Sequence, residues 1–133
     1  MIGKRLRREE QAVKYLILIY SNEAAWSALS DEQRASVGAC HAALTEQLAD
    51  SGELIVSHGL ADPSMGKRVS VHDGQTMTSD GPFAEAKEHL AGFYLIECES
   101  IERAIEYAAR APDAAFGTVE VRPVLVRNGS LDI

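Results

Sequence analysis

Cysteine is scarce in this sequence, and long hydrophobic runs are absent from it. The 133 residues hold two cysteines, Cys40 and Cys98, which form neither a disulfide framework nor a metal-ligand spacing. We therefore expect two reduced, buried thiols in a cytoplasmic protein. No apolar stretch approaches the roughly 20 residues that a membrane helix needs. The start, residues 1–13, contains basic residues but no apolar segment of the kind that a signal peptide requires.

Basic residues are also scarce outside the first twelve positions. The chain holds 13 Lys and Arg against 20 Asp and Glu, and four basic and two acidic residues lie within residues 1–12. The remaining residues therefore carry nine basic and 18 acidic side chains. Such an acidic domain repels a phosphate backbone, so we expect no nucleic-acid partner and no membrane contact. We expect residues 1–13 to be a flexible N-terminal extension and residues 14–133 to form one domain.

Hydrophobic patterning predicts four strands of a buried sheet. Short runs rich in β-branched and aromatic residues occur at 14–20, 53–61, 91–98 and 118–126. Pro123 lies within the last run, which indicates an edge strand or a bulge.

Two helices are expected between these strands. Ser30 and Gln33 have the spacing of a capping box, so the first helix is expected over residues 31–50 and ends before Gly52. Ser100 is expected to cap a second helix over residues 101–111. Its apolar stripe consists of Ile101, Ala104, Ile105 and Ala108.

A β-hairpin is expected in the middle of the chain. Residues 67–72 and 75–79 flank Asp73-Gly74, which is the strongest short-range hairpin signal. The order of elements is β-α-β, hairpin, β-α-β, which predicts an α+β ferredoxin-like sandwich with an inserted hairpin. The strand at 14–20 is apolar on both faces, so we expect a homodimer in which two sheets meet.

His41 is the most informative ionisable residue. On the first helix, Val37, His41, Leu44 and Leu48 fall within an arc of roughly 60°, so His41 points towards the sheet with the apolar residues. Two interpretations are open. His41 is either a core histidine bonded to a backbone carbonyl or a pocket histidine that exchanges a proton near neutral pH.

The other histidines follow less regular patterns. Alternation along residues 53–61 places His58 on one face with Leu54 and Val56, which predicts a second inward histidine. Two interpretations of His58 are open: it either lines a pocket or fills space against a dimer partner. His72 and His89 are expected to be solvated.

The stretch from Thr78 to Glu97 combines turn chemistry with charges. Asp80-Gly81-Pro82 is typical of a turn, which Asp80 stabilises by accepting backbone hydrogen bonds. Alternatively, Asp80 orients an imidazole and raises its basicity. Beyond the turn, we expect Glu85, Lys87 and Glu88 to rim or enter the same pocket.

TSDGPFAEAKEHLAGFYLIE, residues 78–97, resembles the signature of the YCII-related proteins of the DGPF subgroup. The resemblance extends from Lys14 through nearly the whole chain and includes KYLILIY, SHGL and VEVRPV. The residues that stand in the places of the signature are Asp80, Gly81, Pro82, Phe83, Glu85, Lys87, Glu88, Gly92, Phe93 and Tyr94.

This resemblance implies a ferredoxin-like fold that forms a dimeric α/β barrel. It also implies an active-site pair of a histidine in the first helix, matched by His41, and an aspartate, for which Asp80 is the candidate. His58 departs from the subgroup, where a Glu or an amide is expected. The side chains expected to bind a small molecule are His58, Pro82, Phe83, Glu85, Lys87 and Tyr94.

Two functions agree with these features. In the first, His41 and Asp80 catalyse a cofactor-free proton transfer, elimination or isomerisation on a small aromatic or carbonyl-bearing molecule. No phosphate loop, nucleophile elbow or metal-ligand cluster is visible in the sequence. In the second, there is no catalysis, and either the same pocket senses a metabolite or the dimer surface engages a partner such as a sigma factor. The resemblance is relevant to both, because a related branch eliminates chloride from a chlorinated aromatic and some DGPF proteins accompany sigma factors.

Overall fold

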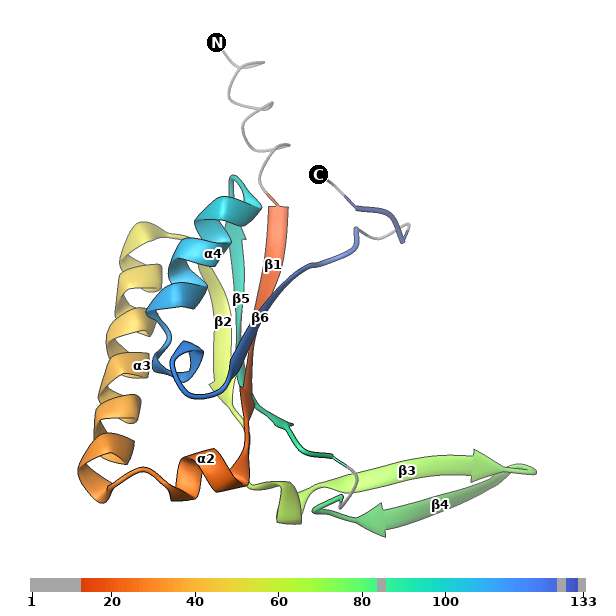
Figure 1. Cartoon of the computed structure of the whole chain (residues 1–133). Coiled ribbons are helices and arrows are strands. Elements are labelled where there is room, and N and C mark those ends of the chain that lie inside the picture. The colour runs from red at the N-terminus through yellow and green to blue at the C-terminus, as the bar shows by residue number, and fades with distance from the viewer. Residues whose placement is uncertain (1–12, 84–85, 127–128, 132–133) are drawn as a thin grey trace.

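The computed structural model describes residues 13–83, 86–126 and 129–131 (Figure 1). The expected extension therefore lies outside the described residues, except for Val13. Val13 belongs to the first strand, where it pairs with Cys98 and is buried. The elements are β1 (Val13–Ser21), α2 (Glu23–Ser27), α3 (Asp31–Ser51), β2 (Leu54–Gly59), the 3-10 turn η1 (Pro63–Met65), β3 (Lys67–His72), β4 (Gln75–Asp80), β5 (His89–Cys98), α4 (Ile101–Arg110), the 3-10 turn η2 (Pro112–Ala114) and β6 (Thr118–Pro123).

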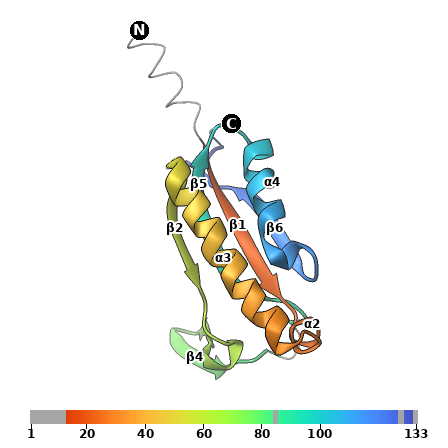
Figure 2. The same cartoon turned by 90° about the vertical axis from the view of Figure 1, so that its left-hand side faces the viewer.

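The body of the protein is a two-layer α+β structure. Its sheet has the strand order β2-β5-β1-β6, with antiparallel pairing throughout. Helices α3 and α4 lie side by side over one face of this sheet (Figures 1 and 2). The arrangement is compatible with the expected ferredoxin-like fold. Pro123 ends β6, which is an edge strand, so the missing backbone donor disrupts no central pairing.

The core lies between the sheet and the helices. Alternate residues of β1, including Tyr15 and Ile17, belong to the same buried apolar cluster as Leu44 and Leu48 of α3. Leu44 and Leu48 are 2% and 0% exposed, and burying a leucine side chain fully stabilises a fold by about 1.5–3 kcal/mol. His41 shares their face of α3, as the 3.6-residue period predicts, and the cluster fixes how this face meets the sheet.

Local capping signals set the ends of α3. The Ser30 hydroxyl accepts a hydrogen bond from the Gln33 backbone N–H at 3.1 Å, and the Gln33 side chain accepts one from the Ser30 N–H at 2.8 Å. Gly52 ends the helix with a φ of 79°, a conformation that glycine adopts without steric cost. The predicted helix is confirmed to within one residue at its C-terminal end.

The expected apolar stripe of α4 is wrong in part. Ala104 and Ala108 are buried, but Ile105 is 52% exposed, and Tyr107 takes its place in the core. The helix is rotated relative to the expected stripe because the Tyr107 ring enters the core while its hydroxyl reaches the carboxylate of Glu53 at 2.6 Å. A buried tyrosine needs such a partner for its hydroxyl.

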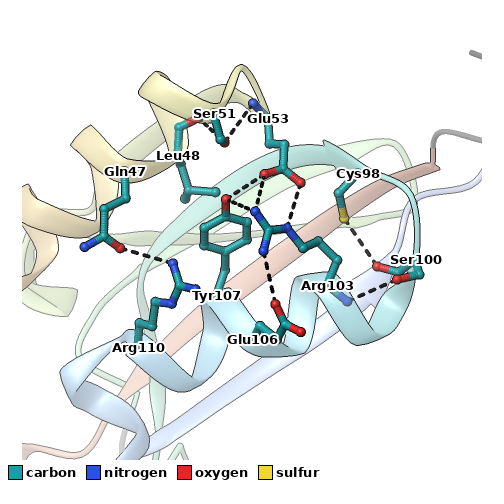
Figure 3. A network of polar contacts seen from close by, with 10 residues as sticks. All are labelled: Gln47, Leu48, Ser51, Glu53, Cys98, Ser100, Arg103, Glu106, Tyr107 and Arg110. Carbon is teal, nitrogen blue, oxygen red and sulfur yellow. Dashed lines mark hydrogen bonds and ion pairs between the residues drawn. The ribbon is translucent and has the colours of Figure 1, made fainter.

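Glu53, Arg103 and Tyr107 form a polar network that joins the start of β2 to α4 (Figure 3). The Arg103 guanidinium donates to both carboxylate oxygens of Glu53, at 3.1 and 3.2 Å. Burial raises the pKa of Glu53, but the hydrogen bonds from Arg103 and Tyr107 outweigh burial, so the net pKa lies below its ordinary value. The network therefore stabilises the end of the sandwich through an ionised Glu53.

The predicted β-hairpin is confirmed. Strands β3 and β4 form a separate two-stranded sheet that projects from one end of the body (Figure 1). Asp73 and Gly74 both have positive φ, 50° and 78°, as a two-residue hairpin turn requires. At the base, the Gly81 N–H donates to the Gly66 carbonyl at 2.9 Å, and a Cβ on Gly81 would overlap the carbonyl oxygen of Pro63. The base of the hairpin thus lies directly against η1.

Two further expectations need correction. Cys98 is buried, as expected, but Cys40 is exposed on α3. His58 faces away from the helices, because β2 has an irregularity at Ile55 that shifts its register with β5. Leu54 pairs with Ile96 on the helix side, whereas His58 pairs with Phe93 on the opposite side. The expected inward direction of His58 is therefore wrong.

Candidate functional site

A cavity of about 970 Å³ lies beside α3 at the end of the body from which the hairpin projects. Its walls come from α2, α3, β1, β2, η1, β5 and η2, together with the segment that links β4 to β5. His41, Tyr94 and Asp113 all line it. His58 and Phe93 line it as well, although they lie on the face of the sheet that the helices do not cover. The cavity therefore extends around the edge of the sheet.

His41 is held at both ring nitrogens. Its Nδ1 lies 2.7 Å from the phenol oxygen of Tyr94, and its Nε2 contacts Oδ1 of Asp113. An ionised carboxylate only accepts hydrogen bonds, so Nε2 donates to Asp113, and Nδ1 of the neutral ring then accepts from the Tyr94 hydroxyl. The three side chains form an ordered chain of hydrogen bonds from the sheet to the helix to η2.

Asp113 is the only buried charged residue in the part of the chain that the structure describes, with 5% of its surface exposed. It lies in the short turn η2 after α4. A carboxylate so buried needs a partner, and His41 is that partner. The sequence does not identify Asp113, because this residue lies just beyond the expected second helix, in a short turn without a periodic pattern.

The predicted pairing of His41 with Asp80 is wrong. Asp80 is the last residue of β4, pairs in register with Lys67 of β3 and forms an ion pair with it. Its side chain is 73% exposed and is not among the residues that line the cavity. The chain turns at Gly81 only after this pairing, so the carboxylate stays outside the cavity, at the base of the hairpin.

Tyr94 places its hydroxyl between β5 and α3. Its ring is 4% exposed, and it belongs to the core cluster. Burial raises the pKa of Tyr94, a hydrogen bond with Thr45 opposes this, and the negative charge of Asp113 raises the pKa further. The phenol therefore stays protonated near neutral pH, and its proton is available to His41.

Most of the other residues expected to bind a small molecule line the cavity. These are His58, Pro82, Phe83, Lys87 and Tyr94. Glu85 lies outside the described residues, and Glu88 is not among the lining residues.

Two lining residues were not expected. His89, predicted to be solvated, is half-buried at the start of β5 and lines the cavity, and so does Trp26 of α2. The α2 helix was missed altogether, although its cap is visible in the sequence. The Asn22 side chain accepts a hydrogen bond from the Ala25 N–H at 3.1 Å.

The described residues hold no group of three or more His, Cys, Asp or Glu side chains that could bind a metal ion. Within the same residues, no helix is both long and apolar enough to span a bilayer. What the cavity does contain is a histidine hydrogen-bonded to an acid on one side and to a phenol on the other.

Comparison with known proteins places this chain in a family. The model of the YCII-related domain matches residues 13–128. The chain belongs to the YCII-related domain family. It is also 35% identical over 120 residues to the uncharacterized protein R00369 of Rhizobium meliloti (strain 1021), an overlap that covers 88% of this chain and 97% of that protein. The match includes every element from β1 to β6, so His41, Tyr94 and Asp113 all lie within the YCII-related domain.

Proposed function

We propose that this YCII-related domain, of the DGPF branch, is a cofactor-free acid–base enzyme that acts on a small molecule in the cavity. The observation that carries this proposal is the position of His41, which lines the cavity with one nitrogen on buried Asp113 and the other on Tyr94. A base oriented by a carboxylate is the arrangement that general acid–base catalysis needs.

The hydrogen bonds define a path for one proton. A substrate group beside the phenol transfers a proton to the Tyr94 oxygen as the phenol proton moves to Nδ1 of His41. The ring becomes an imidazolium, which the Asp113 carboxylate stabilises through Nε2. The reverse transfer delivers the proton to another substrate atom in an isomerisation, or to a departing group in an elimination. Tyr94 is thus the group that touches the substrate, and Asp113 acts through His41 as a positioning residue.

The lining favours a small aromatic or carbonyl-bearing substrate. Trp26, Phe83 and Phe93 supply flat apolar surfaces. Lys87 supplies a positive charge on the segment before β5, where it suits a carbonyl or carboxylate oxygen. Proton removal beside a carbonyl group requires such stabilisation of the oxygen that becomes negative.

Hydrogen exchange of candidate substrates tests the proposal directly. A panel of small aromatic and carbonyl acids is incubated in D₂O with the protein, and the loss of exchangeable C–H signals is followed by proton NMR. We expect exchange of at least one compound with the wild type, and at least a hundredfold slower exchange with His41→Gln. Cys40→Ser changes the neighbouring exposed position of α3 and is the control. Equal rates for wild type and His41→Gln would contradict the proposal.

We also propose that the protein is a homodimer that acts in the cytoplasm. The face of the sheet opposite the helices carries Leu16, Leu18, Val56, Phe93 and Leu95, which the register places in adjacent cross-strand rows. We call this surface the open face. Leu18 is already buried within one chain, whereas Leu16, Val56, Phe93 and Leu95 are partly exposed, and a second copy of the chain would remove these four from water. The two free thiols agree with a reducing compartment. Light scattering at micromolar concentration should return twice the mass of the chain.

A further inference from the structure

The β3–β4 hairpin has almost no contact with its own body beyond its base. All twelve of its strand residues are exposed, and Val69, Val71 and Met77 are 61%, 63% and 53% exposed. An isolated two-stranded hairpin is at best marginally stable in water and needs a further surface to pack on. We therefore expect the extended hairpin to pack on the surface of another molecule.

The two faces of the hairpin differ. Register places Val69 opposite Thr78 and Val71 opposite Thr76, so four β-branched side chains share one face. The other face carries Arg68, whose guanidinium lies 3.8 Å from the ring centre of Phe83 in the hairpin's own chain. Both faces are exposed along the strands. The face with Arg68 also carries Met77, but its other side chains, Ser70, His72, Gln75 and Ser79, are polar. Beyond the Lys67–Asp80 pair at its base, the valine–threonine face is the more apolar of the two, and it is the face that we expect to meet another molecule.

The direction of the hairpin indicates where that molecule lies. The hairpin leaves the end of the body on the side away from α3 and α4 (Figure 1). This is the side of the open face, with Leu16, Leu18 and Phe93. Any body that covers the open face therefore lies next to the hairpin.

The area of the open face also indicates that the hairpin is part of the dimer interface. Four strands about 4.8 Å apart and six residues about 3.4 Å apart span only roughly 400 Å² of open face. A stable interface needs about 800 Å² from each partner. One face of the hairpin adds about 200 Å² by the same spacings. In a two-fold dimer each copy presents its own hairpin and receives that of its partner, so the hairpins supply about the area that is missing.

We infer that the β3–β4 hairpin is an arm that lies along a second copy of this chain seated on the open face, and that it contacts this copy through Val69, Val71, Thr76 and Thr78. The inference rests on the proposed homodimer. It has a consequence for the cavity, since His58 and Phe93 line the cavity from the open face. The second copy closes the cavity on that side.

Charge variants of the two hairpin faces test the arm. Val69→Asp/Val71→Asp places two carboxylates on the valine–threonine face, and Ser70→Asp/Ser79→Asp places two on the arginine face of the same strands. Sedimentation equilibrium should show a dimer dissociation constant at least tenfold higher for the valine variant than for the serine variant. Both variants add two negative charges, so a difference between them reports on the face that carries the charges and on the loss of the two valine side chains from that face.

A shortened hairpin and hydrogen exchange provide independent readouts. Deleting residues 69–72 and 75–78 keeps Asp73-Gly74 as the turn between Arg68 and Ser79 and should also raise the dissociation constant at least tenfold. In the wild type, backbone amides of residues 67–80 should exchange at least tenfold more slowly in the dimer than at dilutions that dissociate it. A wild-type dimer with equal constants for both charge variants, or with a fast-exchanging hairpin, would overturn the arm alone. A monomeric wild type would overturn the homodimer and the arm together.

Discussion

Asp113 and His41 are 72 positions apart in the chain, yet the carboxylate of one contacts Nε2 of the other inside the cavity. The contact joins η2, which follows α4, to the middle of α3. Because Asp113 is buried and His41 is partly exposed, the pair has one member in the protein interior and one at the cavity wall. Asp113 sets which nitrogen of His41 carries the proton, and it thereby directs Nδ1 towards Tyr94.

The first prediction distinguishes Asp113 from Asp80. Nitrogen NMR of the wild type at neutral pH should show His41 protonated at Nε2, because the Asp113 carboxylate accepts that proton. In Asp113→Asn the amide can present either a donor or an acceptor, so a mixture of tautomers is expected. Asp80→Asn should leave the His41 signals unchanged, since Asp80 pairs with Lys67 outside the cavity. A change in Asp80→Asn alone would refute this assignment.

The second prediction concerns Tyr94. Tyr94→Phe keeps the buried ring but removes the hydroxyl that donates to His41, so the proton path is broken. Substrate hydrogen exchange should fall at least tenfold, while stability in urea falls by only about 1 kcal/mol. Tyr20→Phe is the control, because it removes a hydroxyl bonded to Glu120, and Tyr20 is not among the cavity-lining residues. A loss of exchange in Tyr20→Phe as large as that in Tyr94→Phe would show that Tyr94 has no special role.

Local sequence signals predicted most of the fold. The capping box at Ser30, the Gly52 end of α3 and the Asp73-Gly74 hairpin each depend on residues that are neighbours in the chain. The sequence alone therefore predicts them.

The direction of the side chains of β2 could not be predicted in this way. A single irregularity at Ile55 reverses the alternation on which the prediction for His58 depended.

The sequence predicts the histidine of the candidate site but not the acid that contacts it. His41 was found because its helix face also carries Leu44 and Leu48, a periodic signal. Asp113, the acid that contacts His41, was not predicted, because it occupies a turn of three residues with no periodicity. Its contact with His41 depends on how α4 and η2 pack on the sheet. Asp80 stood out through its turn motif, but pairing with Lys67 across the hairpin decides its direction.

The third prediction concerns acid stability. A carboxyl group whose pKa is lower in the folded than in the unfolded protein stabilises the fold above its unfolded pKa. That stabilisation is lost as the pH falls through the folded value. The pKa of Glu53 lies below its ordinary value of 4.5. Its contribution should therefore be full at pH 7 and should disappear between roughly pH 5 and pH 3.

Glu53→Gln measures this contribution. Urea unfolding at one protein concentration should show a loss of roughly 1–2 kcal/mol at pH 7, because the charge-assisted bonds to Arg103 are weakened. The difference from wild type should shrink as the pH falls below 4.5. Glu106→Gln is the matched control, since Glu106 also pairs with Arg103 but is 59% exposed, and such surface pairs contribute little. Equal losses in the two variants would mean that burial of Glu53 has no effect.

The last prediction uses two glycines with opposite surroundings. Gly81→Ala would place a methyl group against the carbonyl oxygen of Pro63, which is backbone and cannot rotate away. The base of the hairpin must shift, so we expect a loss of roughly 1–3 kcal/mol in urea unfolding. Gly38 lies in α3 with nothing within 4 Å of an added Cβ, so Gly38→Ala should stabilise the protein by roughly 0.5–1 kcal/mol through helix propensity. Hydrogen exchange should become faster in residues 67–80 of Gly81→Ala and stay unchanged there in Gly38→Ala. If both alanine variants were stabilised, the contact between Gly81 and η1 would not constrain the hairpin.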